Sequence, residues 1–371
     1  MSIQLIELLR SPERAARLGD RDWDRLIPQA RLARLLGSLY HCLDTLRPRP
    51  AIPEKVWRHL YAGHAVHVKQ CRSLHFELRK LGVALAEAGE RVVLLKGGAY
   101  ILAGLPAASG RLISDIDILV QASNLHKVEA ALGRHGWTSG SIDPYNDRYY
   151  RQWMHEIPPL GHGERHSTLD VHHTILPPTS DSSIDPEALW SAMVEAAPGV
   201  WMLAPVDMVL HSAAHLFHEG EFDHGLRDLL DLDRLLRHFA ATEGEAFFPA
   251  LAARAREMGL QRPLFYALRY TRRFLGTPVP DGFSRELLPR RPTAPGRRLM
   301  DFLFLRAFTP NHSSCRLPFT APALFCLYVR SHYLRMPLRL LLPHLARKAW
   351  MDLFPAAPDR GEKAQGQAAG G

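Results

Sequence analysis

The sequence is poor in cysteine, with only four among 371 residues. Cys42, Cys71, Cys315 and Cys326 are widely scattered, and no two of them form a CxxC pair. This spacing argues against a zinc knuckle and against a disulfide framework. We therefore expect reduced, mostly buried thiols, as in a cytoplasmic protein.

Long apolar runs are missing as well. No run approaches the eighteen or so residues that a membrane-spanning helix needs. Charged side chains interrupt residues 1–14, so we expect no secretory signal there. No internal repeat is visible, which argues against a solenoid. These absences leave a globular protein, expected in the cytoplasm.

What is present is an ordinary globular composition, 46% hydrophobic and 23% charged, in a chain long enough for two domains. The formal net charge is +8. A basic balance favours polyanionic partners such as nucleotides, RNA or an acidic membrane surface, without choosing among them. An arginine-rich, lysine-poor sequence also fits a high-GC bacterial background, so charge alone assigns no function.

Residues 91–120 carry the densest chemistry in the chain. An apolar run at 92–95 is followed by Lys96, Gly97 and Gly98, and then by a helix-compatible piece at 99–103. Glycines after a strand let backbone N–H groups approach an anion closely, and the start of the next helix adds its dipole. The ammonium group of Lys96 is a point charge suited to phosphate.

The end of this stretch predicts a strand that carries two carboxylates. Asp115 and Asp117 alternate with Ile116 and Ile118, which is the two-residue period of a strand. Side chains two residues apart lie on one face, roughly 7 Å apart at their Cα atoms. Two carboxylates so close repel each other, and a hard cation such as Mg²⁺ is the usual remedy.

A second alternating segment, residues 166–173, contains the sequence LDVHH. Its period predicts another strand, with Asp170 and His172 on the same face. Asp170 is the candidate for a third carboxylate. His172 could orient Asp170, contact a phosphate or cap the site.

The order LLKGGAY, then Arg111, then SDIDILV, and LDVHH about fifty residues later, resembles a bacterial family of uncharacterised nucleotidyltransferases. This family is of the polymerase-β type and is related to abortive-infection toxins. The resemblance implies a turn at Gly97 and Gly98 that holds a triphosphate. It also implies that Asp115, Asp117 and Asp170 bind two Mg²⁺ ions, with Mn²⁺ as the alternative.

The chain departs from the wider superfamily at one point, because Gly98 stands where a serine is usual. The phosphate contact would then come from the backbone, Lys96 or Arg111, and we add Ser114 and His172 to the nucleotide-binding set.

The activity implied is Mg²⁺-dependent transfer of a nucleoside monophosphate from a nucleoside triphosphate such as ATP to an acceptor hydroxyl, with release of pyrophosphate. The acceptor, whether RNA, protein or small molecule, stays open. The alternative is a non-catalytic module that binds a nucleotide or RNA on the same fold.

The expected architecture is α+β, a small mixed sheet flanked by helical regions. We expect an N-terminal helical region over 1–90, a catalytic core over 91–200, a C-terminal helical region over 201–354 and a disordered tail over 355–371. Within this plan, 56–88 reads as one long helix, 138–165 as mostly loop, and 186–197 as a short helix that Asp185 starts.

Three readings outside the central stretch stay open. His162, His166, His172 and His173 could bind zinc, and His211, His215 and Glu219 could form a metal-binding helix face, although the latter fits better as packing against the cleft. Arg227 and Asp231 could approach the base or ribose, or pair with each other on a solvated helix face. The basic segment 321–352, which includes Arg330, Arg335, Arg339, Arg347 and Lys348, could face a membrane or RNA, or pack on the domain.

Overall fold

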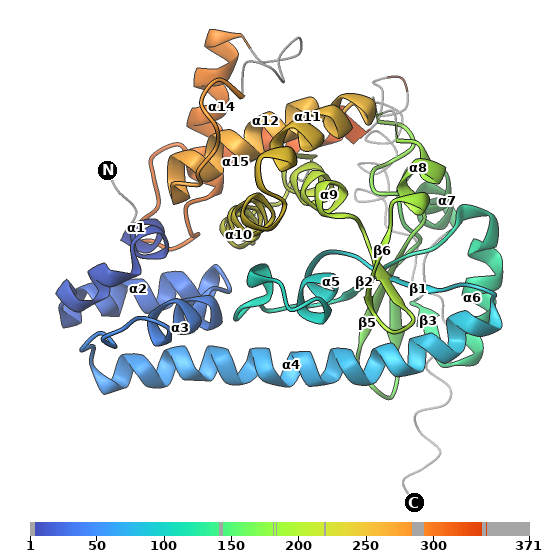
Figure 1. Ribbon diagram of the computed structural model, residues 1–371, viewed down its shortest axis with the longest axis horizontal. Coiled ribbons are helices and arrows are strands. Elements are labelled where there is room, and N and C mark those ends of the chain that lie inside the picture. Colours follow the sequence, from blue (N-terminus) through green and yellow to red (C-terminus); the bar gives the residue numbers. More distant parts are fainter. Residues whose placement is uncertain are drawn as a thin grey trace, which may run out of the picture.

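The computed structural model describes residues 4–140, 144–180, 182, 184–218, 220–283, 293–335 and 339. Figure 1 shows a mixed sheet on one side, a long helix running beneath the molecule and a group of helices above it. The expected α+β class, with helical regions flanking a sheet, is confirmed.

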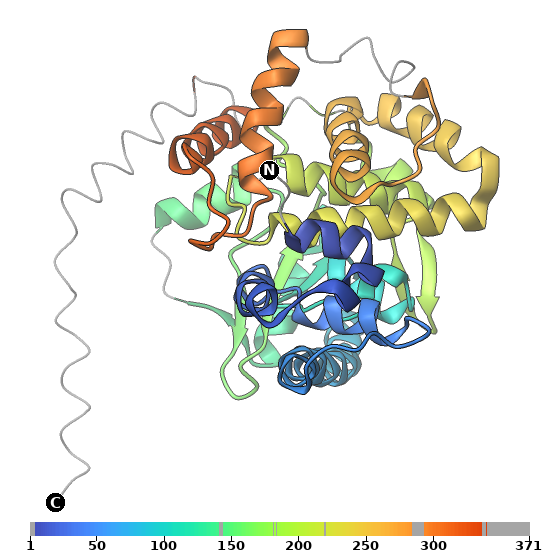
Figure 2. The same ribbon diagram turned by 90° about the vertical axis from the view of Figure 1, so that its left-hand side faces the viewer.

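The N-terminal region is helical, as its apolar periodicity predicts. The long helix α4 spans Glu54–Glu87 and buries Leu60, Leu74, Leu78 and Leu81 along one side. Figure 2 shows α4 nearly end-on, with the other N-terminal helices above it and in front of the sheet. These are α1 (Gln4–Arg10), the 3₁₀ turn η1 (Pro12–Arg17), α2 (Asp20–Leu32) and α3 (Leu36–Asp44).

The sheet has seven strands among the described residues, in the order β3-β4-β5-β2-β1-β7-β6. At its centre β2 pairs antiparallel with β1 and parallel with β5, which places Asp117 directly opposite Asp170. The strands are β1 (Val92–Leu94), β2 (Ile116–Leu119), β3 (Trp137–Ser139), β4 (Leu160–His162), β5 (Thr168–His172), β6 (Val194–Ala197) and β7 (Val200–Met202).

Short connections join these strands. The helix α5 (Lys96–Leu102) follows β1, the turn η2 (Pro106–Ala108) precedes the loop to β2, and η3 (Ala122–Asn124) leads into α6 (Leu125–Arg134).

Two local expectations are wrong. Residues 138–165 contain a helix, α7 (Pro144–Trp153), in which Asp147 and Arg151 form an ion pair one turn apart. The helix expected over 186–197 ends at Ser191 as α8 (Pro186–Ser191), although Asp185 caps it as predicted. A hairpin of β6 and β7 follows, because Gly199 takes a left-handed conformation (φ 76°) that turns the chain back.

The C-terminal region is helical. Its central helix α9 (Pro205–His218) is buried on almost every side and packs against α10 (Gly225–Glu243), α11 (Phe247–Glu257) and α12 (Gln261–Tyr270). The remaining elements are the turn η4 (Gly244–Ala246), a π-helical turn η5 (Thr271–Leu275), α14 (Ala294–Ala307) and α15 (Thr320–Arg335).

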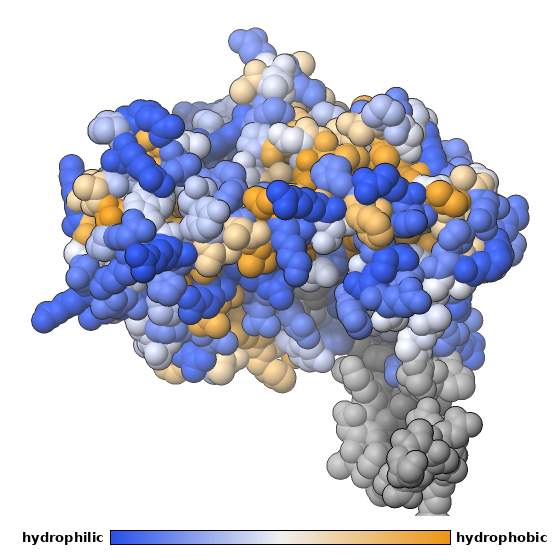
Figure 3. All heavy atoms as spheres, turned by 90° about the horizontal axis from the view of Figure 1, so that it is seen from below, coloured by the Kyte–Doolittle hydropathy of each residue, from blue (hydrophilic) through white to orange (hydrophobic). Residues whose placement is uncertain are grey.

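Part of the basic C-terminal segment packs on the domain. Arg330 donates a hydrogen bond to the carbonyl of Phe217 (2.7 Å) and lies over the ring of Tyr266. Arg347, Lys348 and the tail 355–371 lie outside the described residues. None of the helices in the described part is long and apolar enough to cross a bilayer. On the face that α4 crosses, hydrophobic side chains occur in small groups among hydrophilic ones (Figure 3).

The loop before β2 is held by a close backbone contact. Gly110 has a φ of 71°, and a Cβ atom there would lie 2.1 Å from the backbone of Gly37 at the start of α3. The next residue, Arg111, has its carbonyl 2.8 Å from Nδ1 of His67 on α4. The N-terminal helices therefore set the position of Arg111.

We expect Gly110→Ala to destabilise the protein more than Gly104→Ala. Both glycines have positive φ, but a Cβ at Gly104 would meet nothing within 4 Å. Backbone strain alone should cost Gly104→Ala about 1 kcal/mol. The added overlap with Gly37 should raise the loss for Gly110→Ala by at least about 2 kcal/mol. Urea unfolding measures the free energy of unfolding of both variants. Equal losses would contradict the role of the contact between Gly110 and Gly37 in holding this loop.

Candidate active site

Three candidate carboxylates gather at the centre of the sheet. Asp117 lies in β2 and is buried (4% exposed), and Asp170 faces it from the adjacent strand β5. Asp115 lies one residue before β2 begins, not within the strand as expected, and accepts a hydrogen bond from Ser114 Oγ (3.1 Å). Neighbouring strands lie roughly 4.8 Å apart, so Asp117 and Asp170 are close enough to share a cation.

Asp117 has two cationic or polar neighbours. Lys96 Nζ donates to its Oδ1 (2.7 Å), and Nε2 of His172 lies 3.1 Å from the same oxygen. Burial alone would raise the pKa of Asp117, but Lys96 and His172 hold it well below its ordinary value. Burial likewise disfavours the ammonium group of Lys96, yet Asp117 keeps the pKa of Lys96 above its ordinary value. The carboxylate therefore stays ionised inside the sheet.

The pKa of Asp170 is shifted in the opposite direction. Burial, followed by the charges of Asp117, Glu156 and Asp115, raises the pKa of Asp170 to about 8. Its Oδ1 is buried without a hydrogen-bond partner among the described residues. Buried polar atoms normally have a partner, so this oxygen has capacity that the protein does not use. An all-oxygen donor set with an unsatisfied member fits a hard divalent cation such as Mg²⁺.

Lys96 also marks a strained backbone position. Its φ is 45°, which is uncommon for a residue other than glycine, and it is the first residue of α5. Strain of this kind persists where surrounding contacts impose it. The side chain of the same residue forms the 2.7 Å ion pair with Asp117.

Arg111 connects the sheet region to the helical region. Its Nε donates to Asp231 Oδ2 of α10 (2.6 Å), and Asp228 lies 3.9 Å away. Both Arg111 and Asp231 are buried. The reading of Arg227 and Asp231 as an ion pair on a solvated face is therefore wrong, since Arg227 is also buried and pairs with Asp228.

The two glycines have different roles. Both lie buried in the first turn of α5. A Cβ at Gly97 would lie 2.0 Å from Nη1 of Arg111, whereas a Cβ at Gly98 would only touch Leu94 at 3.5 Å. Gly97 is thus required by the guanidinium group of Arg111, a reason that the sequence pattern did not suggest.

A cavity of about 340 Å³ opens beside these groups. It lies between α5, the loop before β2, and the helices α9 and α10. The predicted residues Lys96, Gly97, Arg111, Ser114, Asp115 and Asp117 all line it, while Gly98, Asp170 and His172 do not. The other lining residues are Tyr100, Ile113, Ser212, His215, Glu221, Asp223, His224, Arg227, Asp228 and Asp231.

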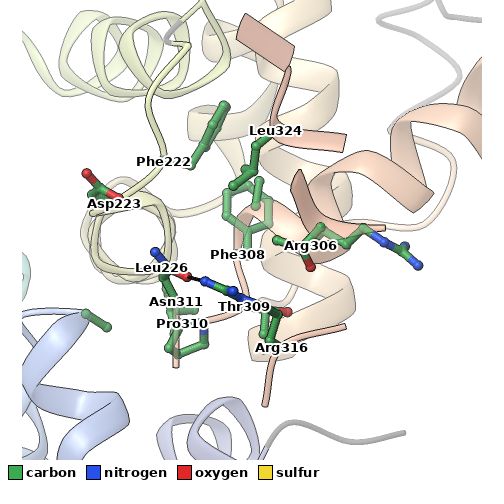
Figure 4. A pocket seen from close by; sticks show the side chains of 13 residues that line it. Phe222, Asp223, Leu226, Arg306, Phe308, Thr309, Pro310, Asn311, Arg316 and Leu324 are labelled. Atoms are coloured by element: carbon green, nitrogen blue, oxygen red, sulfur yellow. Dashed lines mark hydrogen bonds between the residues drawn. The ribbon is translucent and has the colours of Figure 1, made fainter. Parts of the chain in front are cut away.

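A second cavity, of about 50 Å³, lies between α10, α14 and α15. Figure 4 shows Phe222, Phe308 and Leu324 close together on its wall, and Arg306 extending away from it. Arg316 donates to Asn311 (2.5 Å), the bond drawn there. This cavity is a small gap in apolar packing and offers no group of catalytic carboxylates.

The proposed histidine sites do not form as expected. His162 lies against the carbonyl of His135, and His166 is exposed, so His162, His166, His172 and His173 make no cluster among the described residues. His211 is buried and His215 lines the larger cavity, which agrees with packing against the cleft. Glu219 lies outside the described residues.

Residues 19–276 match a family described as uncharacterised nucleotidyltransferases. The match covers more than half of the chain and includes each candidate residue described above. It confirms the resemblance read from residues 92–120 and 168–173 at the level of that family. No curated protein and no solved structure matches the chain significantly.

We expect Gly97→Ala to destabilise the protein strongly and Gly98→Ala to be tolerated. The new methyl group at 97 must displace the guanidinium group of Arg111 and leave Asp231 as an unpaired buried charge. Breaking a buried pair in this way costs about 3–5 kcal/mol. Gly98→Ala should change the free energy of unfolding by less than about 1 kcal/mol. Denaturant unfolding measures the free energy of unfolding of both variants. Similar values for the two would refute the packing role of Gly97.

We also expect His211 to make stability depend on pH. Burial, then the charge of Lys96, lowers the pKa of His211 from 6.5 to about 3. Between pH 3 and pH 6.5, His211 is therefore protonated in the unfolded chain and neutral in the folded chain. The contribution of His211 to the free energy of unfolding is fully present above pH 6.5 and decreases as the pH falls towards 3. At pH 5 the loss from this residue is about 2 kcal/mol.

The measurement is the free energy of unfolding at pH 8 and at pH 5 for the natural protein and for His211→Gln. Because glutamine does not titrate, the variant should lose about 2 kcal/mol less between the two pH values. Identical pH dependence in both proteins would mean that His211 is not the titrating group.

Proposed function

Because this chain belongs to the family of uncharacterised nucleotidyltransferases, we propose that it transfers a nucleoside monophosphate from a nucleoside triphosphate to an acceptor, with release of pyrophosphate. The observation that carries the proposal is the pairing of Asp117 with Asp170 across β2 and β5, with Asp115 adjacent. Asp170 in this group has a buried, unpartnered oxygen. A cluster of this kind supports binding of divalent cations.

In this mechanism Asp115, Asp117 and Asp170 would hold two Mg²⁺ ions, which when bound would supply charge stabilisation for an in-line displacement. Asp170 lies on the strand beside Asp117 and, when it is ionised beside the cations, would accept the proton of the acceptor hydroxyl.

Lys96 and Arg111 are the groups that neutralise the triphosphate. Both line the cavity beside the aspartates. Arg111 is fixed by its Nε bond to Asp231, and its Nη2 lies 3.9 Å from Asp228, which leaves Nη1 of its planar fork for an oxygen of the substrate. Lys96 would exchange part of its contact with Asp117 for a phosphate oxygen. Ser114, at the mouth of the cavity, adds a hydroxyl group.

One observation favours the alternative, a non-catalytic module that binds a nucleotide or RNA. Lys96 Nζ already lies 2.7 Å from Asp117 Oδ1, so a cation at this oxygen must compete with an ammonium group. Gly98 also favours the non-catalytic module, because a serine hydroxyl group is missing at this position. Both readings share the phosphate-binding groups and differ in turnover.

We expect Asp117→Asn to lower the rate of nucleotidyl transfer by at least about 100-fold. Because this change leaves Lys96 without its charged partner, circular dichroism of the variant checks that it is folded before activities are compared. Purified protein would be incubated with Mg²⁺, each α-labelled nucleoside triphosphate in turn, and a host lysate separated into RNA, protein and small-molecule fractions. Label in one fraction with the natural protein identifies both nucleotide and acceptor class. Asp147→Asn, which removes an exposed carboxylate on α7, is the matched control and should keep full activity.

Two results would contradict the proposal. Full activity in Asp117→Asn would show that the assigned site is wrong. Tight triphosphate binding by the natural protein without label in any fraction would favour the non-catalytic module.

A further inference from the structure

Three side chains with metal-binding atoms meet at the edge of the carboxylate cluster. His155 and Glu156 come from the segment between α7 and β4, and His172 is the last residue of β5. Each offers one ligand atom, and these atoms all lie within 4.8 Å of one another. The backbone brings them together, because Glu156 forms an antiparallel bridge with His172.

The spacing is that of a coordination sphere. Glu156 Oε2 lies 3.4 Å from Nε2 of His172 and 3.8 Å from Nε2 of His155. Metal–ligand bonds of 2.0–2.1 Å at tetrahedral angles place neighbouring ligand atoms roughly 3.4 Å apart. Small side-chain adjustments would bring all three atoms onto one ion.

Nε2 is the ring atom that both histidines direct toward the carboxylates. The side chain of His172 is fully buried, so water does not compete for its Nε2. The single atom Nε2 of His172 faces two carboxylates, those of Glu156 and Asp117. One N–H group cannot serve both acceptors well, whereas a cation among the three groups satisfies them together.

We propose that His155, Glu156 and His172 bind one transition-metal ion, with Zn²⁺ as the ion whose preferences match best. Imidazole nitrogens suit Zn²⁺, while all-carboxylate sets suit Mg²⁺, so this site differs in kind from that of Asp115, Asp117 and Asp170. Two histidines and a glutamate leave a fourth position open.

The proposal does not depend on nucleotidyl transfer. A bound ion here would hold His172, and through it Asp117, in place whether or not the protein turns over a nucleotide. Zinc retention can therefore be measured without an activity assay.

The experiment is a zinc-binding measurement on the full chain. Protein stripped with a chelator is loaded with Zn²⁺ in the presence of excess Mg²⁺, desalted and analysed for metal by mass spectrometry. Affinity is obtained by competition with a chromogenic chelator. We expect one Zn²⁺ per chain. Glu156→Gln and His155→Asn should each weaken binding by more than 10-fold, since even the loss of an outer-shell partner costs 10–100-fold.

Two variants serve as controls. Asp170→Asn removes a carboxylate of the proposed Mg²⁺ site and should retain zinc. His166→Asn removes an exposed imidazole at a position with φ 54°, a conformation that asparagine tolerates, and should also retain zinc. Loss of zinc in Asp170→Asn together with retention in Glu156→Gln would assign the ion to the aspartates and overturn the proposal.

A second readout uses the natural protein alone and so does not depend on the folding of any variant. Co²⁺ bound at this site should give the intense visible bands of a four-coordinate ion, and one equivalent of Zn²⁺ should remove them. Absence of these bands, or less than one zinc per chain, would also overturn the proposal.

Discussion

The buried carboxylate of Asp117 is the constraint on which the centre of this structure depends. An ionised group in the middle of a sheet is unstable unless it is paired. Its partners come from the two strands on either side: Lys96 follows β1, and His172 ends β5. Lys96 supplies its ammonium group from the first residue of α5, where its φ is 45°. The strand order β5-β2-β1 is therefore also the order of the interacting groups His172, Asp117 and Lys96.

A second buried pair ties the helical region to this sheet. Arg111 reaches Asp231 across 120 positions of sequence, and the absence of a side chain at Gly97 makes room for it. The loop that carries Arg111 is held in turn by Gly110 against Gly37. Residues from the N-terminal helices, the sheet and α10 thus fix one guanidinium group. The cavity beside it is the product of all three regions.

Sequence patterns predicted the parts of this site that lie within single strands. The alternation around Asp117 and around Asp170 needs only local periodicity, and family resemblance added their role. Glu156 was not singled out, and Asp231 was paired with Arg227 instead of Arg111, because nothing local distinguishes a carboxylate that meets a distant cation from one in water. The hairpin of β6 and β7 was missed for a related reason: strands of three or four residues carry too little periodicity, and only Gly199 marked the turn.

The overall charge of the chain is a poor guide to the charge of its site. The protein carries a net charge of +8, yet its larger cavity is lined by six carboxylates and only three lysine or arginine side chains. Arginines elsewhere are engaged with carbonyl groups, as Arg330 is with Phe217. A polyanion such as a triphosphate would be repelled from this cavity unless cations enter with it. In the proposed function, divalent ions would therefore enter with the triphosphate and offset these carboxylates, and the basic surface would only bring the substrate near.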